Sequence, residues 1–229
     1  MIDIEENLVA LEDRIQVALR ASGRRRDAVS LLAVSKKQPI SAIQQAAALG
    51  LANFGENYLQ EALAKIGQLA SPGCHWHFIG ALQGNKTRQV AEHFDWVHSV
   101  DRERIARRLS EQRPPGVPAL NICVQVNIDA EQGKAGVLPG QLPALLESIV
   151  GLPNLRLRGL MAIPEAGASR DQRARSFAQM HELFIARQQA IGSEHFDTLS
   201  MGMSADLEQA IDAGATLLRV GTAIFGPRG

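Results

Sequence analysis

The segment SLLAVSKKQPISAIQQAAALG, residues 30–50, indicates the fold class. Its first part, Ser30–Lys36, is a short β-rich run, and its second part, Ile40–Leu49, is a helical pattern, with Pro39 between them. A strand that leads directly into a helix is one βα unit, and repeated βα units demand a parallel sheet with right-handed crossovers. The number of such units in the chain then distinguishes an open sheet from a closed barrel.

The same alternation continues along the chain. The remaining β-like runs are Leu51–Phe54, His75–Gly80, Trp96–Val100, Ala119–Ile128, Arg156–Ala162, Thr198–Met201 and Thr216–Val220. The remaining helical patterns are Gln60–Leu69, Lys86–His93, Arg102–Gln112, Leu142–Ile149, Asp171–Ile191 and Ala205–Ala213. An amphipathic helix, Ile4–Ala21, precedes the first strand and is followed by Gly23.

Eight βα units favour an α/β fold of the TIM-like (β/α)8 barrel type, with an extra N-terminal helix. We expect one domain over residues 1–229, because no linker-like segment interrupts the alternation. A six-stranded open sheet is the alternative, since Leu51–Phe54 and Thr198–Met201 are short for strands.

Composition excludes several classes of protein. The 24 Lys and Arg residues balance 24 Asp and Glu residues, so there is no basic surplus for a nucleic acid backbone. No apolar stretch approaches the roughly 20 residues of a membrane-spanning helix. The N-terminus is acidic where a signal peptide would be basic, and Cys74 and Cys123 show no CxxC spacing. We therefore expect a cytoplasmic protein that binds neither nucleic acid nor a membrane.

Polar residues follow the expected strands at their carboxyl ends, where barrels form their active sites. Lys36 ends the first strand, and a lysine at a barrel mouth loses hydration, which favours its neutral, nucleophilic amine. Strand alternation places Lys36 on the face of Leu32 and Val34, and Lys37 on the opposite face, so only one of the two lysines can point into the barrel. A pair of solvated lysines that opens a loop is the alternative.

Two further clusters follow the expected seventh and eighth strands, whose loops often bind phosphate in such barrels. Ser200 and Ser204 flank a glycine just before a helix, where backbone N–H groups can hold an anion, although a plain helix cap is the alternative. The segment LLRVGTAIFG, residues 217–226, ends its strand in Arg-Val-Gly-Thr. His75 and His77 share a strand face, but no third ligand has suitable spacing, so we expect no metal site.

Seven segments carry a resemblance that extends over most of the chain: AVSK (33–36), FGENYLQEA (54–62), WHFIGALQGNK (76–86), HSVDR (98–102), RGLMAI (158–163), LSMGMSADLEQAI (199–211) and RVGTAIFGPR (219–228). In this order they resemble the pyridoxal phosphate homeostasis protein family. The fold of that family is similar to the N-terminal barrel of alanine racemase. The resemblance implies that the chain binds pyridoxal 5′-phosphate (PLP) and acts in vitamin B6 balance.

The resemblance also implies which residues bind the cofactor. Lys36 would hold PLP as a Schiff base, and Arg219 would face the pyridine nitrogen. The phosphate would be held by Ser200, the backbone of Met201, Gly221 and Thr222. Three more residues would line the pocket or support it from behind: Asn57, His77 and Ser204.

Arg219 bears on whether the protein is an enzyme. A guanidinium can only donate, so it would keep the pyridine nitrogen unprotonated and make the ring a weaker electron sink. Racemases on the related barrel take a second base, a tyrosine, from a C-terminal domain. Here the sequence ends at Gly229, soon after the eighth strand, and Tyr58 is its one tyrosine. We therefore expect a PLP-binding protein without catalytic residues.

Two other functions stay open from the sequence. The first is a PLP-dependent amino-acid racemase or a related enzyme, with Lys36 as one base. The second is a class I aldolase-like barrel, in which Lys36 attacks a phosphorylated sugar directly. The partners that we expect are PLP, small amino acids and PLP-dependent apoenzymes, and we expect the protein to be a monomer or a weak dimer.

Overall fold

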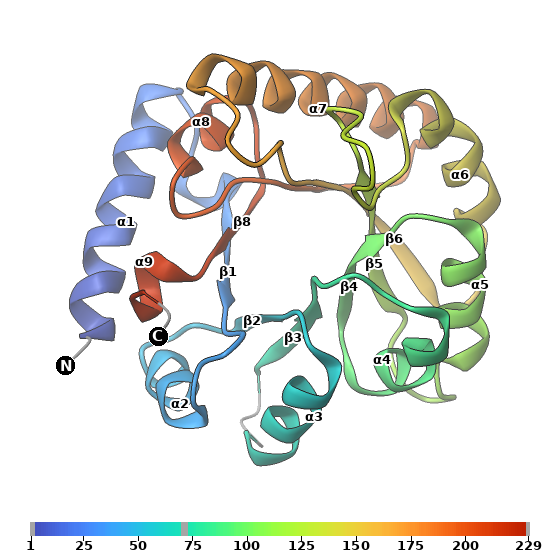
Figure 1. Cartoon of the computed structure of the whole chain (residues 1–229), viewed down its shortest axis with the longest axis horizontal. Helices are drawn as coiled ribbons and strands as arrows, with labels where there is room; N and C mark the ends of the chain where they lie inside the picture. The colour runs from blue at the N-terminus through green and yellow to red at the C-terminus, as the bar shows by residue number, and fades with distance from the viewer. Residues whose placement is uncertain (1–2, 70–72, 228–229) are drawn as a thin grey trace.

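The computed structural model describes residues 3–69 and 73–227, and these form a closed parallel barrel (Figure 1). Neighbouring strands pair in chain order, and the eighth pairs back with the first from Ser30↔Leu217 to Ala33↔Val220. The strands are β1 (Ser30–Val34), β2 (Asn53–Glu56), β3 (His75–Phe78), β4 (Trp96–Val100), β5 (Leu120–Val126), β6 (Leu155–Ala162), β7 (Thr198–Ser200) and β8 (Leu217–Val220). This closure confirms the predicted (β/α)8 barrel and excludes the open sheet.

Helices form a ring outside the barrel (Figure 1). They are α2 (Ile40–Ala48), α3 (Leu59–Gln68), α4 (Thr87–His93), α5 (Glu103–Gln112), α6 (Leu142–Ile149), α7 (Arg170–Ile191), α8 (Leu207–Asp212) and the short α9 (Thr222–Phe225). Short 3-10 turns lie at Arg26–Ala28, Gly84–Lys86 and Pro139–Gln141. The seven helices predicted between strands are all present, and sequence patterns had given no sign of α9. Within the described ranges, no helix has the length and apolar character that crossing a membrane requires.

The extra N-terminal helix completes the ring. This helix, α1 (Ile4–Ala21), buries Leu11, Ile15 and Leu19, the apolar face that the sequence predicted. It packs against α8, α9 and α2 (Figure 1), and Asn7 donates a hydrogen bond to the carbonyl of Ile224 in α9. Because α9 is too short to cover the strands beside it, α1 takes the place of the missing outer helix.

Apolar side chains fill the layer between strands and helices, but the inside of the barrel also holds several polar side chains. Barrels of this type usually fill their interior with bulky branched side chains. Here His77, His98, Ser200 and Arg219 are buried. Their contacts show that they lie inside, since His98 on β4 reaches Ser200 on β7 across the barrel, with 3.0 Å between Nδ1 and Oγ. The fold therefore positions a polar interior below the carboxyl ends of its strands.

Candidate functional site

A cavity of about 300 Å³ lies at the carboxyl ends of the strands. We call it the Lys36 cavity, and its lining residues are Val34, Lys36, Asn57, Ile79, Ile163, Met203, Ser204, Ala205, Arg219, Gly221 and Thr222. Among these described residues the charged groups are Lys36 and Arg219, and no acidic side chain lines the cavity. Two positive groups in one cavity favour an anionic ligand.

The structure places Lys36, and not Lys37, in the cavity. Lys36 follows β1 in a turn, is half-buried and lies in the lining together with Val34 from the same strand. Lys37 takes a left-handed backbone conformation, with φ of 62°, and its side chain is exposed. The turn thereby separates two lysines that are adjacent in the sequence.

A buried ion cluster holds the turn that carries the cavity lysine. The Lys65 ammonium donates to the carbonyl of Ser35 at 2.8 Å, to Glu56 at 2.8 Å and to Glu61 at 2.6 Å. Glu61 also accepts from the backbone N–H of Lys37. Burial raises the pKa of the Glu56 carboxyl, while hydrogen bonds from Lys65 and Ser35 oppose that rise. The backbone on both sides of the cavity lysine is thus tied to one cluster.

Backbone N–H groups from two loops line another part of the cavity. In the described part of the chain, the N–H groups of Ser204, Ala205, Gly221 and Thr222 have no hydrogen-bond acceptor. The hydroxyl of Ser204 accepts from the N–H of Ala223 at 3.2 Å, which joins the loop after β7 to the loop after β8. Several N–H groups that converge without an acceptor can hold an anion such as a phosphate.

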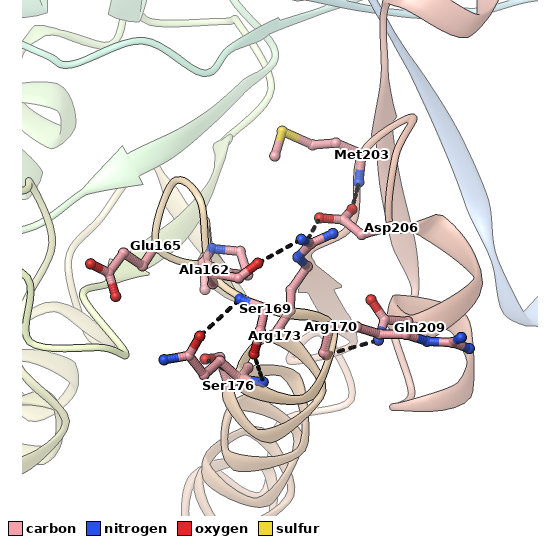
Figure 2. A network of polar contacts seen from close by, with 12 residues as sticks. Ala162, Glu165, Ser169, Arg170, Arg173, Ser176, Met203, Asp206 and Gln209 are labelled. Carbon is pink, nitrogen blue, oxygen red and sulfur yellow. Dashed lines mark hydrogen bonds and ion pairs between the residues drawn. The ribbon is translucent and has the colours of Figure 1, made fainter.

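The loop after β7 is supported from α7, as Figure 2 shows. Asp206 is buried, and its carboxylate accepts from the N–H of Met203 at 2.6 Å. Its second oxygen lies 3.9 Å from Nε of Arg173 on α7, and Gln209 on α8 donates to the carbonyl of Arg170. These contacts connect the start of α7 to the loop that supplies half of the N–H groups.

Arg219 is held rigidly at the base of the cavity. Its Nη1 donates to the carbonyl and to the hydroxyl of Ser200 at 2.7 and 2.8 Å, and its Nη2 donates to the carbonyl of Ala162 at 2.9 Å. Burial lowers the pKa of Arg219 to about 10, so the guanidinium remains charged near neutral pH. Three of the five N–H groups of a guanidinium are thus used, and the other two have no acceptor among the residues that the structure describes.

Asn57 contributes an acceptor to the cavity. Its Oδ1 is buried and has no hydrogen-bond partner among the residues that the structure describes. Gly80 packs tightly against the backbone of Asn57, because a Cβ at position 80 would lie 2.2 Å from the backbone carbonyl oxygen of Asn57. A buried orphan acceptor is costly, so a ligand that donates to it would gain binding energy.

The structure brings together six of the nine expected cofactor residues: Lys36, Asn57, Ser204, Arg219, Gly221 and Thr222. It does not bring Ser200 or Met201 into the cavity. The Ser200 hydroxyl is fully buried beneath Arg219, and the N–H of Met201 already donates to the carbonyl of Leu217 at 3.2 Å. Neither group is available to a phosphate, because one lies below the cavity and the other is used by the sheet.

His77 also lies outside the Lys36 cavity. It is buried inside the barrel, between Asn53 and His98, and its ring stacks on Trp96 with 5.2 Å between ring centroids. Of the two expected roles, lining or support from behind, this position favours support. Sequence reasoning missed five lining residues: Val34, Ile79, Ile163, Met203 and Ala205. They are apolar, and their one signal was a position at or just after the end of a strand.

Comparisons with known proteins identify relatives of this chain. The family model described as alanine racemase, N-terminal domain, matches residues 7–229. The pyridoxal phosphate homeostasis protein of Pseudomonas aeruginosa is 55% identical over 228 residues, which cover 100% of this chain and 97% of that protein.

Solved structures show the same relationship. PipY of Synechococcus elongatus with PLP bound is 38% identical, with a TM-score of 0.85, and the match covers 98% of this chain and 100% of PipY. Alanine racemase from Corynebacterium glutamicum is 16% identical, with a TM-score of 0.66 over 96% of this chain and 61% of that one, and this likeness shows the fold alone. The chain therefore belongs to the family of the pyridoxal phosphate homeostasis proteins, built on the barrel of the alanine racemase N-terminal domain.

Proposed function

We propose that this chain binds PLP in the Lys36 cavity and acts as a PLP carrier in vitamin B6 homeostasis. The observation that carries the proposal is that one cavity combines an amine, a guanidinium and four backbone N–H groups without acceptors. The loops around Ser204 and Gly221 would hold the phosphate. The amine of Lys36 would attack the aldehyde, so that a C=N bond forms and water leaves, which gives a Schiff base.

The donor set of the cavity fits the remaining atoms of PLP. Arg219 keeps two N–H groups for the pyridine nitrogen, and Asn57 offers a polar side chain near the ring. PLP supplies an electron sink when it is bound, and a donor that never gives up its proton keeps this sink weak. The site is thus suited to holding the cofactor.

We propose that the protein does not catalyse efficiently. Racemisation by the two-base route needs bases on opposite faces of the substrate, and the described lining offers one amine, Lys36, and no carboxylate, histidine or tyrosine. Tyr58 is 52% exposed and is not part of the lining. Incubation with single-enantiomer amino acids should therefore give no racemisation above that of free PLP, and turnover above this level would contradict the proposal.

The Lys36 cavity also suggests how PLP is exchanged. It lies at the carboxyl ends of the strands, and the side chain of Met203, one of its lining residues, is 37% exposed. We propose that PLP enters and leaves here, reacts with small amino acids and passes to PLP-dependent apoenzymes. We further propose that residues 1–229 form one domain, which acts in the cytoplasm as a monomer or a weak dimer.

The proposal is tested by the visible absorption of the purified protein mixed with PLP. We expect a visible band that disappears on borohydride treatment, and a pyridoxyl group on the peptide of Lys36 in mass spectrometry. Lys36→Ala should abolish both, and Lys37→Ala, which changes the exposed neighbour, should retain both. An adduct on another residue would contradict the proposal. A colourless protein that reduction couples to a phosphorylated sugar would favour the aldolase alternative.

A further inference from the structure

A chain of hydrogen-bonded side chains runs through the barrel interior and ends at Arg219. It joins β2, β3, β4, β7 and β8, and we call it the interior relay. Its four contacts are Asn53 Oδ1–His77 Nε2 at 3.1 Å, His77 Nδ1–His98 Nε2 at 2.9 Å, His98 Nδ1–Ser200 Oγ at 3.0 Å and Ser200 Oγ–Arg219 Nη1 at 2.8 Å. Asn53 and His77 also line a second cavity, of about 320 Å³, at the amino ends of the strands. The relay therefore connects the two ends of the barrel.

Arg219, the last member of the relay, determines which atom donates in each of its hydrogen bonds. Arg219 can only donate, so the Ser200 oxygen accepts from it, and the Ser200 hydrogen needs another acceptor. In the described interior that acceptor is Nδ1 of His98. A neutral His98 then carries its hydrogen on Nε2 and donates to Nδ1 of His77. A neutral His77 in turn donates from Nε2 to Oδ1 of Asn53.

We infer that Asn53, His77, His98 and Ser200 form a relay with one fixed direction, which positions the Arg219 guanidinium as a permanent donor to the Lys36 cavity. His77 and His98 are positioning residues in this proposal, because neither lines that cavity. The inference rests on the proposed function where it concerns PLP, since the ligand of Arg219 would be the pyridine nitrogen.

Both imidazoles must be neutral for the relay to hold. Burial, with the positive charge of Arg219, lowers the pKa of His98 to about 3. Burial and the neighbouring histidines lower the pKa of His77 well below its ordinary value. A protonated His77 would place two N–H groups against each other across 2.9 Å. Besides Arg219 itself, the titratable groups near the relay are His75 on β3, Cys123 on β5, Arg158 on β6, Asp197 just before β7 and Asp206 just before α8.

The relay has a consequence for the Lys36 cavity, because it leaves Arg219 as a donor there. The relay and the carbonyls of Ser200 and Ala162 use three N–H groups of Arg219, and the two others have no acceptor in the described chain. A guanidinium has no acceptor to offer a protonated pyridine, and the clamp fixes which of its N–H groups remain. The pyridine nitrogen of bound PLP should therefore accept a hydrogen bond and stay unprotonated.

The first test uses the protein without PLP. Long-range ¹H–¹⁵N NMR of labelled protein distinguishes the two imidazole tautomers, and His77 and His98 variants assign the signals. We expect both rings to be protonated on Nε2 alone and not to titrate between about pH 6 and 8, where an ordinary histidine would. A hydrogen on Nδ1 of either ring, or a titration in this range, would overturn the inference whether or not PLP binds.

The second test uses PLP labelled with ¹⁵N in the pyridine ring. His98→Asn places an amide oxygen near the former Nδ1 and so keeps an acceptor for Ser200, whereas His98→Gln places its amide near the former Nε2 and loses that acceptor. We expect His98→Gln to change the pyridine ¹⁵N shift and to weaken PLP binding about ten-fold, as for the loss of one hydrogen bond. His98→Asn should keep the pyridine ¹⁵N shift and the PLP affinity close to those of the wild type. His93→Gln, on the exposed face of α4, is the control and should match the wild type in both.

These outcomes separate the two proposals. If Lys36 forms no adduct, the proposed function fails, while the tautomers of the free protein still test the relay. If PLP binds but His98→Gln and His98→Asn give the same pyridine shift as the wild type, the relay does not position Arg219. Should His98→Gln fail to fold, the tautomers of the wild-type protein decide.

Discussion

Replacing Lys65 by methionine should destabilise the protein strongly. The Lys65 side chain is 8% exposed and donates three hydrogen bonds of 2.6 to 2.8 Å, two of them to carboxylates. Methionine has a similar length but cannot donate, so Glu56 would become a buried charge without its cation. Removing one partner of a buried pair costs about 3–5 kcal/mol. For a chain of this size that corresponds to a loss of about 6–20 °C in melting temperature.

The pH dependence of this loss follows from Glu56. Burial already raises the pKa of its carboxyl, and removing the Lys65 cation removes the main opposing influence. A carboxyl whose pKa is higher in the folded state than in the unfolded chain binds more protons when folded. The folded state therefore loses stability as the pH rises through these pKa values. The destabilisation by Lys65→Met should be larger at pH 8 than at pH 5.

Urea unfolding, followed by tryptophan fluorescence and circular dichroism, measures the effect. Lys86→Met is the matched control, because the Lys86 side chain is half-buried and has no hydrogen bond or ion pair in the described part of the chain. It should change the free energy of unfolding by less than about 0.5 kcal/mol. The reasoning is refuted if Lys65→Met costs less than about 1 kcal/mol, or if its cost is the same at both pH values.

Two other perturbations test the packing behind the site. Gly80→Ala should cost about 1–3 kcal/mol of stability and weaken PLP binding, because its Cβ would lie 2.2 Å from the backbone carbonyl oxygen of Asn57. Gly84→Ala is the control and should change neither, because the nearest atom to its Cβ is 3.9 Å away. Equal denaturation and PLP titration curves for the two variants would contradict this reasoning. Burial raises the pKa of the Cys123 thiol to about 12, so in the native protein at pH 8 a thiol reagent should modify Cys74 and leave Cys123 unmodified until urea is added. Rapid modification of two thiols in the folded protein would show that the interior is open to the reagent.

The unusual interior of the barrel agrees with a binding role. Each barrel strand supplies alternate residues to the interior, and a barrel needs bulky side chains there for packing. This chain instead places His77, His98 and Arg219 inside, where every polar contact must be satisfied. Hydrogen bonds offset the stability that is lost in apolar packing, and they also fix the orientation of the Arg219 guanidinium.

The sequence by itself determined the order of the elements and the end of the barrel at which the site lies. The alternation of β-rich and helical patterns predicted the parallel barrel, and the polar residues after strands predicted Lys36, Ser204 and Arg219 as neighbours. Such patterns are local, because strand and helix periods repeat within a few residues and the carboxyl ends of parallel strands share one edge.

Only the tertiary structure decided which of these residues reach the cavity. Ser200 ends β7 and lies below Arg219, while Ser204, four residues later, lies in the lining. His98 was one polar residue among many in the sequence until the closed barrel placed it 3.0 Å from Ser200. The His98–Ser200 contact joins residues 102 positions apart in the sequence, and its distance depends on how the eight strands tilt and close. No spacing along the chain carries that information.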